Sequence, residues 1–187
     1  MDKSLTNFLS FTKRLLYPAL KGDGVYIDFT MGNGYDTLFL AKYAPNGRVY
    51  AFDVQQAALD STNVKLEAEG IVNTDLILDS HANIDKYVKE PIDGGLFNLR
   101  WLPGGGDKTI TTQYESTIEA LQKGLDLLKI DGVIVVAVYP GHEAGAHEGK
   151  MIQEWAGSLN KEKYDVLLHR LINVPECQYL VAFQKKA

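Results

Sequence analysis

The chain has 187 residues, of which 45% are hydrophobic and 23% charged, so it can bury the core of one soluble globular domain. No apolar run reaches the roughly 18 residues of a membrane span, and the first residues lack the pattern of a signal peptide. A single cytoplasmic domain over residues 1–187 is therefore expected. The net charge of −5 argues against broad binding to nucleic-acid backbones, although Lys13, Arg14, Lys21, Arg100 and Lys108 could form a local basic patch.

Strands and helices alternate through the first half of the chain. Apolar residues at helical spacing predict a leading helix, and short β-branched or aromatic runs predict strands. The expected elements are a helix at about Asn7–Ala19, a strand at Gly24–Asp28, a helix at Tyr35–Tyr43, a strand at Arg48–Asp53, a helix at Gln55–Glu69 and a strand at Thr74–Leu78.

The second half begins with an expected turn over Pro91–Gly95 and closes with a pair of strands near Pro175. The intervening elements are a strand at Leu96–Leu99, a helix at Thr111–Leu128 closed by Asp131-Gly132, an apolar strand at Val133–Val138, a helix at Glu148–Leu159, and strands at Asp165–Ile172 and Gln178–Gln184. This pattern predicts a doubly wound α/β domain of seven strands that ends in an antiparallel hairpin.

The stretch Gly24–Thr37, read as G-V-Y-I-D-F-T-M-G-N-G-Y-D-T, predicts a strand, a tight glycine turn and a helix. A helix N-terminus facing the turn favours part of a nucleotide-like cofactor. The third glycine of a dinucleotide motif is missing, and so is the lysine of a phosphate-binding P-loop. These absences weaken an NAD site and exclude that ATP site. An ordinary turn in another α/β protein stays the alternative.

Further polar residues follow the other strands at the edge where α/β sheets bind ligands. Asp53 stands about twenty residues after the glycine turn, where Rossmann-like folds bind a ribose. The glycine-rich stretch from Asn98 to Lys108 follows the fourth strand, and the stretch from Tyr139 to Glu143 follows the fifth. One site built from these strand ends is expected.

The segments I-D-F-T-M-G-N-G-Y-D-T, A-F-D-V-Q, L-I-L-D-S-H, F-N-L-R-W-L-P-G-G-G-D-K and Y-P-G-H-E together resemble the YtqB/MnmM family of Rossmann-like, S-adenosylmethionine-dependent methyltransferases. The resemblance implies a class I methyltransferase fold with strand order 3-2-1-4-5-7-6 and an antiparallel last strand. It also implies methylation of 5-aminomethyl-2-thiouridine at the tRNA wobble position. Phe29, Arg100 and a longer glycine run depart from the family pattern.

The resemblance, together with the positions of polar residues after the fourth and fifth strands, assigns roles to residues at the strand ends. Asn98, Trp101 and His142 are expected to be catalytic, with Asn98 orienting the acceptor nitrogen and His142 or Glu148 helping to remove its proton. Arg100, Trp101, Lys108, Tyr139 and Glu148 are expected to contact the substrate, and no metal ligands are expected. The implied cofactor-binding residues are Asp28, Gly32, Asn33, Gly34, Asp36, Asp53, Gln55, Asp79, Ser80, His81 and Asn98.

Two other functions compete with the tRNA reading. The acceptor could be rRNA or a small amine, in keeping with the acidic composition. The chain could also be a non-catalytic module that binds S-adenosylmethionine, although such a module needs neither Asn98 nor Trp101. The expected partner is tRNA near its anticodon; a homodimer is one possible assembly, and the sequence leaves the oligomeric state open.

Overall fold

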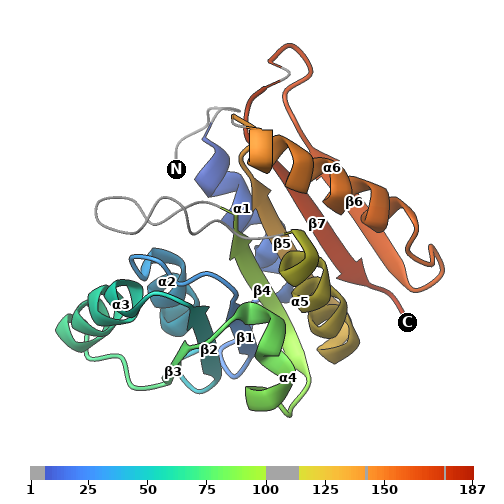
Figure 1. The fold of residues 1–187 in the computed structure, drawn as a ribbon. Helices are drawn as coiled ribbons and strands as arrows, with labels where there is room; N and C mark the ends of the chain where they lie inside the picture. The colour runs from blue at the N-terminus through green and yellow to red at the C-terminus, as the bar shows by residue number, and fades with distance from the viewer. Residues whose placement is uncertain (1–6, 100–113, 142, 175) are drawn as a thin grey trace.

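The computed structural model describes residues 7–99, 114–141, 143–174 and 176–187, which form a seven-stranded sheet in the order β3-β2-β1-β4-β5-β7-β6 (Figure 1). β7 runs antiparallel to both of its neighbours, β5 and β6. This order and the direction of β7 confirm the predicted fold. The strands are β1 (Val25–Asp28), β2 (Arg48–Asp53), β3 (Thr74–Leu78), β4 (Ile92–Asn98), β5 (Leu128–Val138), β6 (Tyr164–His169) and β7 (Tyr179–Lys185).

Helices cover both faces of the sheet, with α5 and α6 in front of it and α1 behind it in Figure 1. None of the helices in the described ranges is long and apolar enough to cross a membrane. The helices are α1 (Phe8–Leu16), α2 (Tyr35–Tyr43), α3 (Gln56–Ala68), α4 (Ile84–Tyr87), α5 (Tyr114–Leu127) and α6 (Glu143–Gly157), with 3-10 turns η1 (Tyr17–Ala19) and η2 (His81–Asn83).

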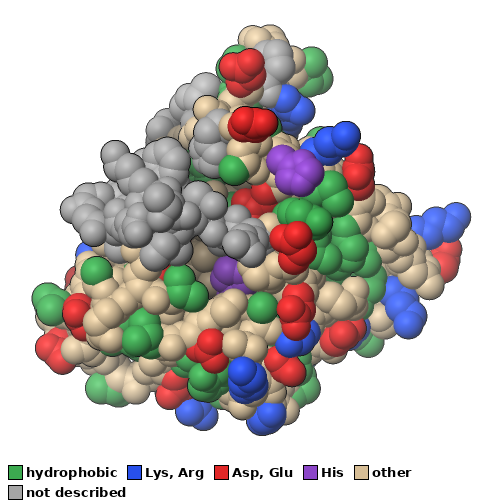
Figure 2. Space-filling model, viewed as in Figure 1, with side chains coloured by type: hydrophobic (Ala, Val, Ile, Leu, Met, Phe, Trp, Pro, Cys, Tyr) green, Lys and Arg blue, Asp and Glu red, His purple; other side chains and the backbone are tan. Residues whose placement is uncertain are grey.

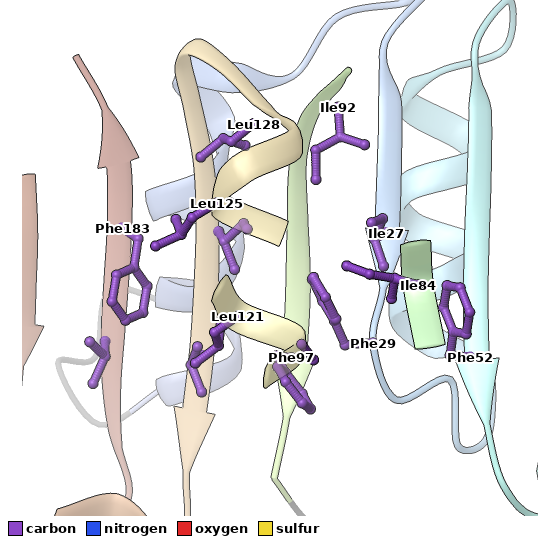
Figure 3. Packing of buried hydrophobic residues seen from close by; sticks show 14 of the residues in the cluster. Ile27, Phe29, Phe52, Ile84, Ile92, Phe97, Leu121, Leu125, Leu128 and Phe183 are labelled. Atoms are coloured by element: carbon purple, nitrogen blue, oxygen red, sulfur yellow. The ribbon is translucent and has the colours of Figure 1, made fainter. Parts of the chain in front are cut away.

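The core on the α5–α6 face contains a stacked pair of rings, Phe29 after β1 and Phe97 on β4, with centroids 4.9 Å apart (Figure 3). Phe29 is the larger residue that departs from the family pattern, and its side chain is fully buried. Two glycines leave room for it, because a Cβ on Gly95 would lie 2.8 Å from the Phe29 ring and one on Gly124 would lie 3.0 Å from it. Phe29 is thus accommodated by small neighbours.

The expected turn over Pro91–Gly95 is wrong, because β4 already begins at Ile92. Gly94 and Gly95 allow neighbouring strands to approach closely. A Cβ on Gly94 would lie 2.5 Å from the Val133 carbonyl oxygen, and a Cβ on Gly95 would lie 2.8 Å from the Ile27 carbonyl oxygen.

The negative charge of Asp93, also in β4, is balanced by its neighbours. Its carboxylate accepts hydrogen bonds from the Val25 amide at 3.0 Å and from the ammonium groups of Lys21 and Lys129 at 2.9 and 2.7 Å.

Two further boundaries differ from the sequence predictions. β5 begins at Leu128, so Asp131-Gly132 lies inside the strand, where Asp131 has a φ of 66°. α6 begins at Glu143, five residues before the predicted start. Its first turns contain Gly145 and exposed polar residues. They lack the apolar periodicity from which a helix is predicted, so the sequence does not reveal where α6 begins.

Candidate functional site

The β1–α2 turn is built by two left-handed glycines, Gly32 with φ 48° and Gly34 with φ 74°. Gly34 is the N-cap of α2 and lies against α3, so that a Cβ there would be 2.8 Å from the Thr62 hydroxyl. Both its backbone conformation and the lack of space require glycine. The turn therefore holds the N-terminus of α2 open toward the carboxyl edge of the sheet.

Two carboxylates at the ends of β1 and β2 fix the shape of this turn. Asp28 accepts hydrogen bonds from the Thr37 hydroxyl at 2.6 Å and from the Thr30 amide at 3.1 Å. Asp53 accepts from the Gly32 amide at 3.0 Å and from the Gln55 amide at 3.1 Å. Asp53 thus connects the end of β2 to the glycine turn, and Gln55 contributes a backbone group to this connection.

The electrostatics of the turn favour a cationic ligand. Burial, reinforced by the charge of Asp36, raises the pKa of Asp28 to about 7. Burial also raises the pKa values of Asp36 and Asp53, although Lys13 and Asn98 act against the shift at Asp36 and backbone amides act against it at Asp53. A positive ligand would stabilise the ionised carboxylates, whereas a phosphate would be repelled. These carboxylates therefore suit S-adenosylmethionine, which carries a positive sulfonium and a positive ammonium group.

Asn98 ends β4 beside this turn and is held at both ends of its side-chain amide. Its Nδ2 donates to the Asp36 carboxylate at 2.5 Å, and its Oδ1 accepts from the Tyr139 hydroxyl at 3.2 Å. Its backbone forms two hydrogen bonds of 2.9 Å with the Thr30 hydroxyl. The structure thus brings Asn98, Asp36 and Tyr139 from three separate elements into one polar cluster.

The β3 end presents the three residues expected near the adenine. Asp79 accepts hydrogen bonds from Asn83, Tyr87 and its neighbouring amide, and the Asn83 bond is the main cause of its lowered pKa. The Ser80 hydroxyl accepts from the Ala82 amide at 3.2 Å and caps η2. Both side chains therefore have structural partners in η2 and α4, and their contact with adenine stays a prediction.

His81 follows in η2, buried against the Phe97 ring, with centroids 4.7 Å apart. Burial lowers the pKa of His81 to about 4, so that its imidazole is neutral at physiological pH. Among the residues that the structure describes, none forms a hydrogen bond with its Nε2. A buried polar atom without a partner fits a ligand contact at this edge, which stays a prediction.

Of the remaining predicted site residues, two lie within the described part of the chain and four do not. Glu148 lies buried within α6, where its carboxylate accepts from the Thr117 hydroxyl of α5 at 2.7 Å. Asn33, in the glycine turn, accepts a longer hydrogen bond of 3.4 Å from Ser61. Arg100, Trp101, Lys108 and His142 lie outside the described residues.

Sequence reasoning missed two contributors to the site. The sequence places Thr30 only within the turn, yet its hydroxyl connects that turn to the backbone of Asn98. The sequence assigns Lys13 only to a basic patch, yet its charge acts on Asp36 from α1. The polar turn sequence could have singled out Thr30, whereas no local pattern predicts the charge interaction between Lys13 and Asp36. In the described parts of the chain, no group of three or more His, Cys, Asp or Glu side chains could hold a metal ion.

Comparison with known proteins gives consistent matches. The family described as "Putative rRNA methylase" matches residues 49–185. The chain is 33% identical over 178 residues to a tRNA (mnm(5)s(2)U34)-methyltransferase, chloroplastic, of Arabidopsis thaliana. That match covers 89% of this chain and 64% of the plant protein, so the chain spans just under two thirds of its relative.

Solved structures agree with this assignment. A "putative rRNA-methylase" from Clostridium thermocellum superposes with a TM-score of 0.91 at 36% identity, covering 97% of this chain and 99% of that one. SMU.1697c, a "putative methyltransferase" from Streptococcus mutans in complex with SAH, superposes with a TM-score of 0.88 at 37% identity, covering 99% of each chain. The chain therefore belongs to the "Putative rRNA methylase" family of S-adenosylmethionine-dependent methyltransferases.

Proposed function

We propose that this protein is an S-adenosylmethionine-dependent N-methyltransferase that acts on RNA, with the aminomethyl group of 5-aminomethyl-2-thiouridine at the tRNA wobble position as its acceptor. The main support for the proposal is that the side-chain amide of Asn98 is hydrogen-bonded to both Asp36 and Tyr139 beside the glycine turn. The name of the plant relative supports a wobble uridine as the acceptor.

Asn98 is suited to orient an amine. An ionised Asp36 can only accept hydrogen bonds, so it faces the Nδ2 group and fixes the carbonyl oxygen on the other side. That oxygen accepts from Tyr139 and has a second lone pair for an N–H of the acceptor. The bound cofactor supplies an electrophilic methyl group, and Asn98 directs the nitrogen lone pair toward it.

An aliphatic amine must lose a proton before it can attack. His142, after β5, is our candidate for the base, and a His142→Ala variant should lose most activity at low pH, where the amine is protonated. Glu148 is less suited to this role, because the Thr117 hydroxyl already donates to its buried carboxylate. Tyr139, whose hydroxyl donates to Asn98, would act as a positioning residue.

RNA contact is assigned to Arg100, Trp101 and Lys108, with Trp101 packing on the base. Acidic and basic side chains are intermingled on the described surface visible in Figure 2. A local contact near the acceptor is therefore favoured over a broad basic surface. Neutralising Arg100 and Lys108 should weaken tRNA binding and reduce its salt dependence, while cofactor affinity should hardly change.

An rRNA acceptor is the second candidate. An 88-residue segment is 33% identical to the Ribosomal RNA small subunit methyltransferase H of Oenococcus oeni, although the match covers only 43% of this chain. A small-molecule amine and a purely SAM-binding role are the further alternatives. The anticodon contact and the possible homodimer inferred from the sequence stay predictions.

A methylation assay with purified protein separates these candidates. An anticodon stem-loop bearing 5-aminomethyluridine should be methylated, whereas the same stem-loop with plain uridine, rRNA fragments and small amines should not. In a strain that lacks the gene, mass spectrometry of wobble nucleosides should show the unmethylated amine, which wild-type protein converts and Asn98→Ala does not. Binding of SAH without methylation of any acceptor would contradict the proposal.

A further inference from the structure

The start of α1 packs against Tyr139, whose hydroxyl donates to Asn98. The ring of Phe8, the first residue of α1, meets the Tyr139 ring edge-on, with centroids 5.9 Å apart and planes at 72°. Phe8 is buried, and Tyr139 packs against the apolar cluster to which Phe8 belongs. This contact with α1 therefore helps to set the direction of the Tyr139 hydroxyl.

The middle of α1 lies beside Asp36, which accepts a hydrogen bond from the same amide. The ammonium group of Lys13 is 4.4 Å from the centroid of the Phe39 ring. Phe39 follows Asp36 by three residues in α2, and residues with this spacing share one face of a helix. Lys13 therefore lies on the side of α2 that carries Asp36, in agreement with the action of its charge on that carboxylate. No carboxylate in the described ranges forms an ion pair with Lys13.

The ionisation of Asp36 decides which way the Asn98 amide faces. A carboxylate only accepts hydrogen bonds, so it pairs with Nδ2 of the amide, at 2.5 Å. A protonated Asp36 could instead donate to Oδ1, and the Tyr139 hydroxyl, which can donate or accept, could then accept from Nδ2. Both arrangements satisfy the cluster, but only the first presents a carbonyl oxygen to an amine.

The groups around Asp36 act on its ionisation in opposite directions. Burial has the largest effect and raises the pKa of Asp36, whereas the charge of Lys13 and the hydrogen bond from Asn98 oppose this rise. Of the two lysines in this region, Lys13 is the one whose charge acts on Asp36. The titratable groups of the region are Lys13 of α1, Asp28 of β1, Asp53 of β2, Tyr139 after β5, and Lys65 of α3, which lies over the Tyr35 ring.

We propose that α1 positions the Asn98 amide for catalysis, with Lys13 keeping Asp36 a carboxylate and Phe8 holding the Tyr139 ring. Lys13 and Phe8 are positioning residues, because each acts through a hydrogen-bond partner of Asn98. The inference rests on the proposed function, in which the carbonyl oxygen of Asn98 orients the acceptor amine. It makes a helix outside the cofactor turn part of the device that selects the orientation of that oxygen.

A titration of Asp36 tests the Lys13 contact without any methyl acceptor. In carbon-13 NMR of the free protein, the Asp36 carboxyl carbon should titrate at a higher pH in Lys13→Met than in the wild type, because the opposing positive charge is gone. Lys13→Arg should restore the wild-type midpoint. The matched control is Lys42→Met, which removes a lysine of α2 that is paired with Glu69 at the surface and should leave the midpoint unchanged. An unchanged midpoint in Lys13→Met would overturn the role of Lys13.

Single-turnover methylation tests the consequence for catalysis. Relative to the wild type, the rate of Lys13→Met should fall by up to roughly tenfold at pH values below the Asp36 midpoint and recover as pH rises, because the carboxylate returns. The ratio of the two rates cancels the ionisation of the amine itself. In an Asp36→Asn background, which has no carboxylate to keep ionised, Lys13→Met should have no effect. A rate ratio independent of pH would mean that Lys13 does not act through Asp36.

Phe8→Leu tests the start of α1. It keeps an apolar side chain but removes the edge-on ring contact, so the rate should fall several-fold, and this fall should vanish in a Tyr139→Phe background, where the hydroxyl is gone. The control is Phe11→Leu, the same substitution in the same helix at a ring that stacks on His169 with centroids 4.5 Å apart, which should leave the rate unchanged. Equal losses from Phe8→Leu with and without the Tyr139 hydroxyl would overturn the role of Phe8.

The two kinds of measurement separate this inference from the proposed function. A wild type that methylates no acceptor would overturn the proposed function and the catalytic part of the inference, whereas the NMR midpoint would still show whether Lys13 controls Asp36. A wild type that methylates the stem-loop, with a rate ratio for Lys13→Met that is flat with pH, would overturn the inference alone.

Discussion

The side-chain amide of Asn98 donates to the carboxylate of Asp36 at 2.5 Å, which joins the end of β4 to the first turn of α2. The sequence predicts only a cofactor contact for Asp36. The hydrogen bond gives it a second role, because a change at the cofactor turn would alter the orientation of the residue assigned to the acceptor. On the proposed assignment, this contact would couple the cofactor half of the site to the acceptor half.

Asn98→Ala should lower the single-turnover methylation rate by roughly 100-fold or more, while SAH affinity falls much less, because the lost interaction acts mainly on the acceptor in the transition state. Tyr139→Phe is a second variant for which a smaller loss of rate is expected. It removes the hydroxyl that donates to Asn98 Oδ1 and should cost less, because Asp36 still fixes the amide. A near-normal rate for Asn98→Ala would show that the β4 end is only scaffold.

Asp53→Ala should weaken S-adenosylmethionine binding by about 1–3 kcal/mol, because it removes a half-buried acceptor and frees the Gly32 amide that shapes the turn. Isothermal titration with SAH measures the loss. Asp75→Ala is the control, since it removes a surface carboxylate that is bonded to Arg48 on the same strand pair. Equal affinities for the Asp53 variant and the wild type would remove Asp53 from the cofactor site.

The alternation of strands and helices and the glycine turn could be predicted from local patterns in the sequence, whereas the strand order was implied by the family resemblance. Asp28, Gly32, Gly34 and Asp53 lie at the strand ends where the alternation of elements placed them. The start of β4 could not be predicted, because Gly94 and Gly95 signal a turn locally and are required by the approach of neighbouring strands. The contact between Asp36 and Asn98 spans 62 residues, and only the folded topology reveals it.

The raised pKa of Asp28 predicts how pH affects stability and cofactor binding. Its pKa rises from 3.8 to about 7, so the folded state retains a proton that the unfolded chain has lost. The contribution of Asp28 to the free energy of unfolding is therefore fully present below about pH 4 and is lost as pH rises toward about 7. A cationic cofactor prefers the ionised form, so its affinity should rise over the same interval.

Urea unfolding and SAM titration at several pH values, with wild type and Asp28→Asn compared, measure the two trends. The difference between the proteins isolates Asp28 from His81, whose lowered pKa acts in the opposite direction. Parallel pH profiles for wild type and variant would show that Asp28 does not titrate in this interval.

Gly124→Ala tests the packing around the ring of Phe29. In an unobstructed helix this substitution would stabilise by up to about 1 kcal/mol. Here the new methyl group would lie 3.0 Å from Phe29 Cζ and 3.1 Å from Ile134 Cδ1. The Phe29 ring cannot move away easily, because it is fully buried and stacked on Phe97. Overpacking should therefore prevail and lower the free energy of unfolding by about 1–3 kcal/mol.

A double-mutant cycle identifies the cause of this loss. Phe29→Leu alone should destabilise the protein by leaving a gap beside Phe97, and Gly124→Ala should be better tolerated in that background than in the wild type. Gly157→Ala, also in a helix but with no atom within 4 Å of the new Cβ, should be neutral or slightly stabilising. Urea unfolding of the four proteins of the cycle and this control gives the coupling energy. Additive effects of the two substitutions would mean that the ring does not confine residue 124, and that the stacked pair tolerates a larger neighbour.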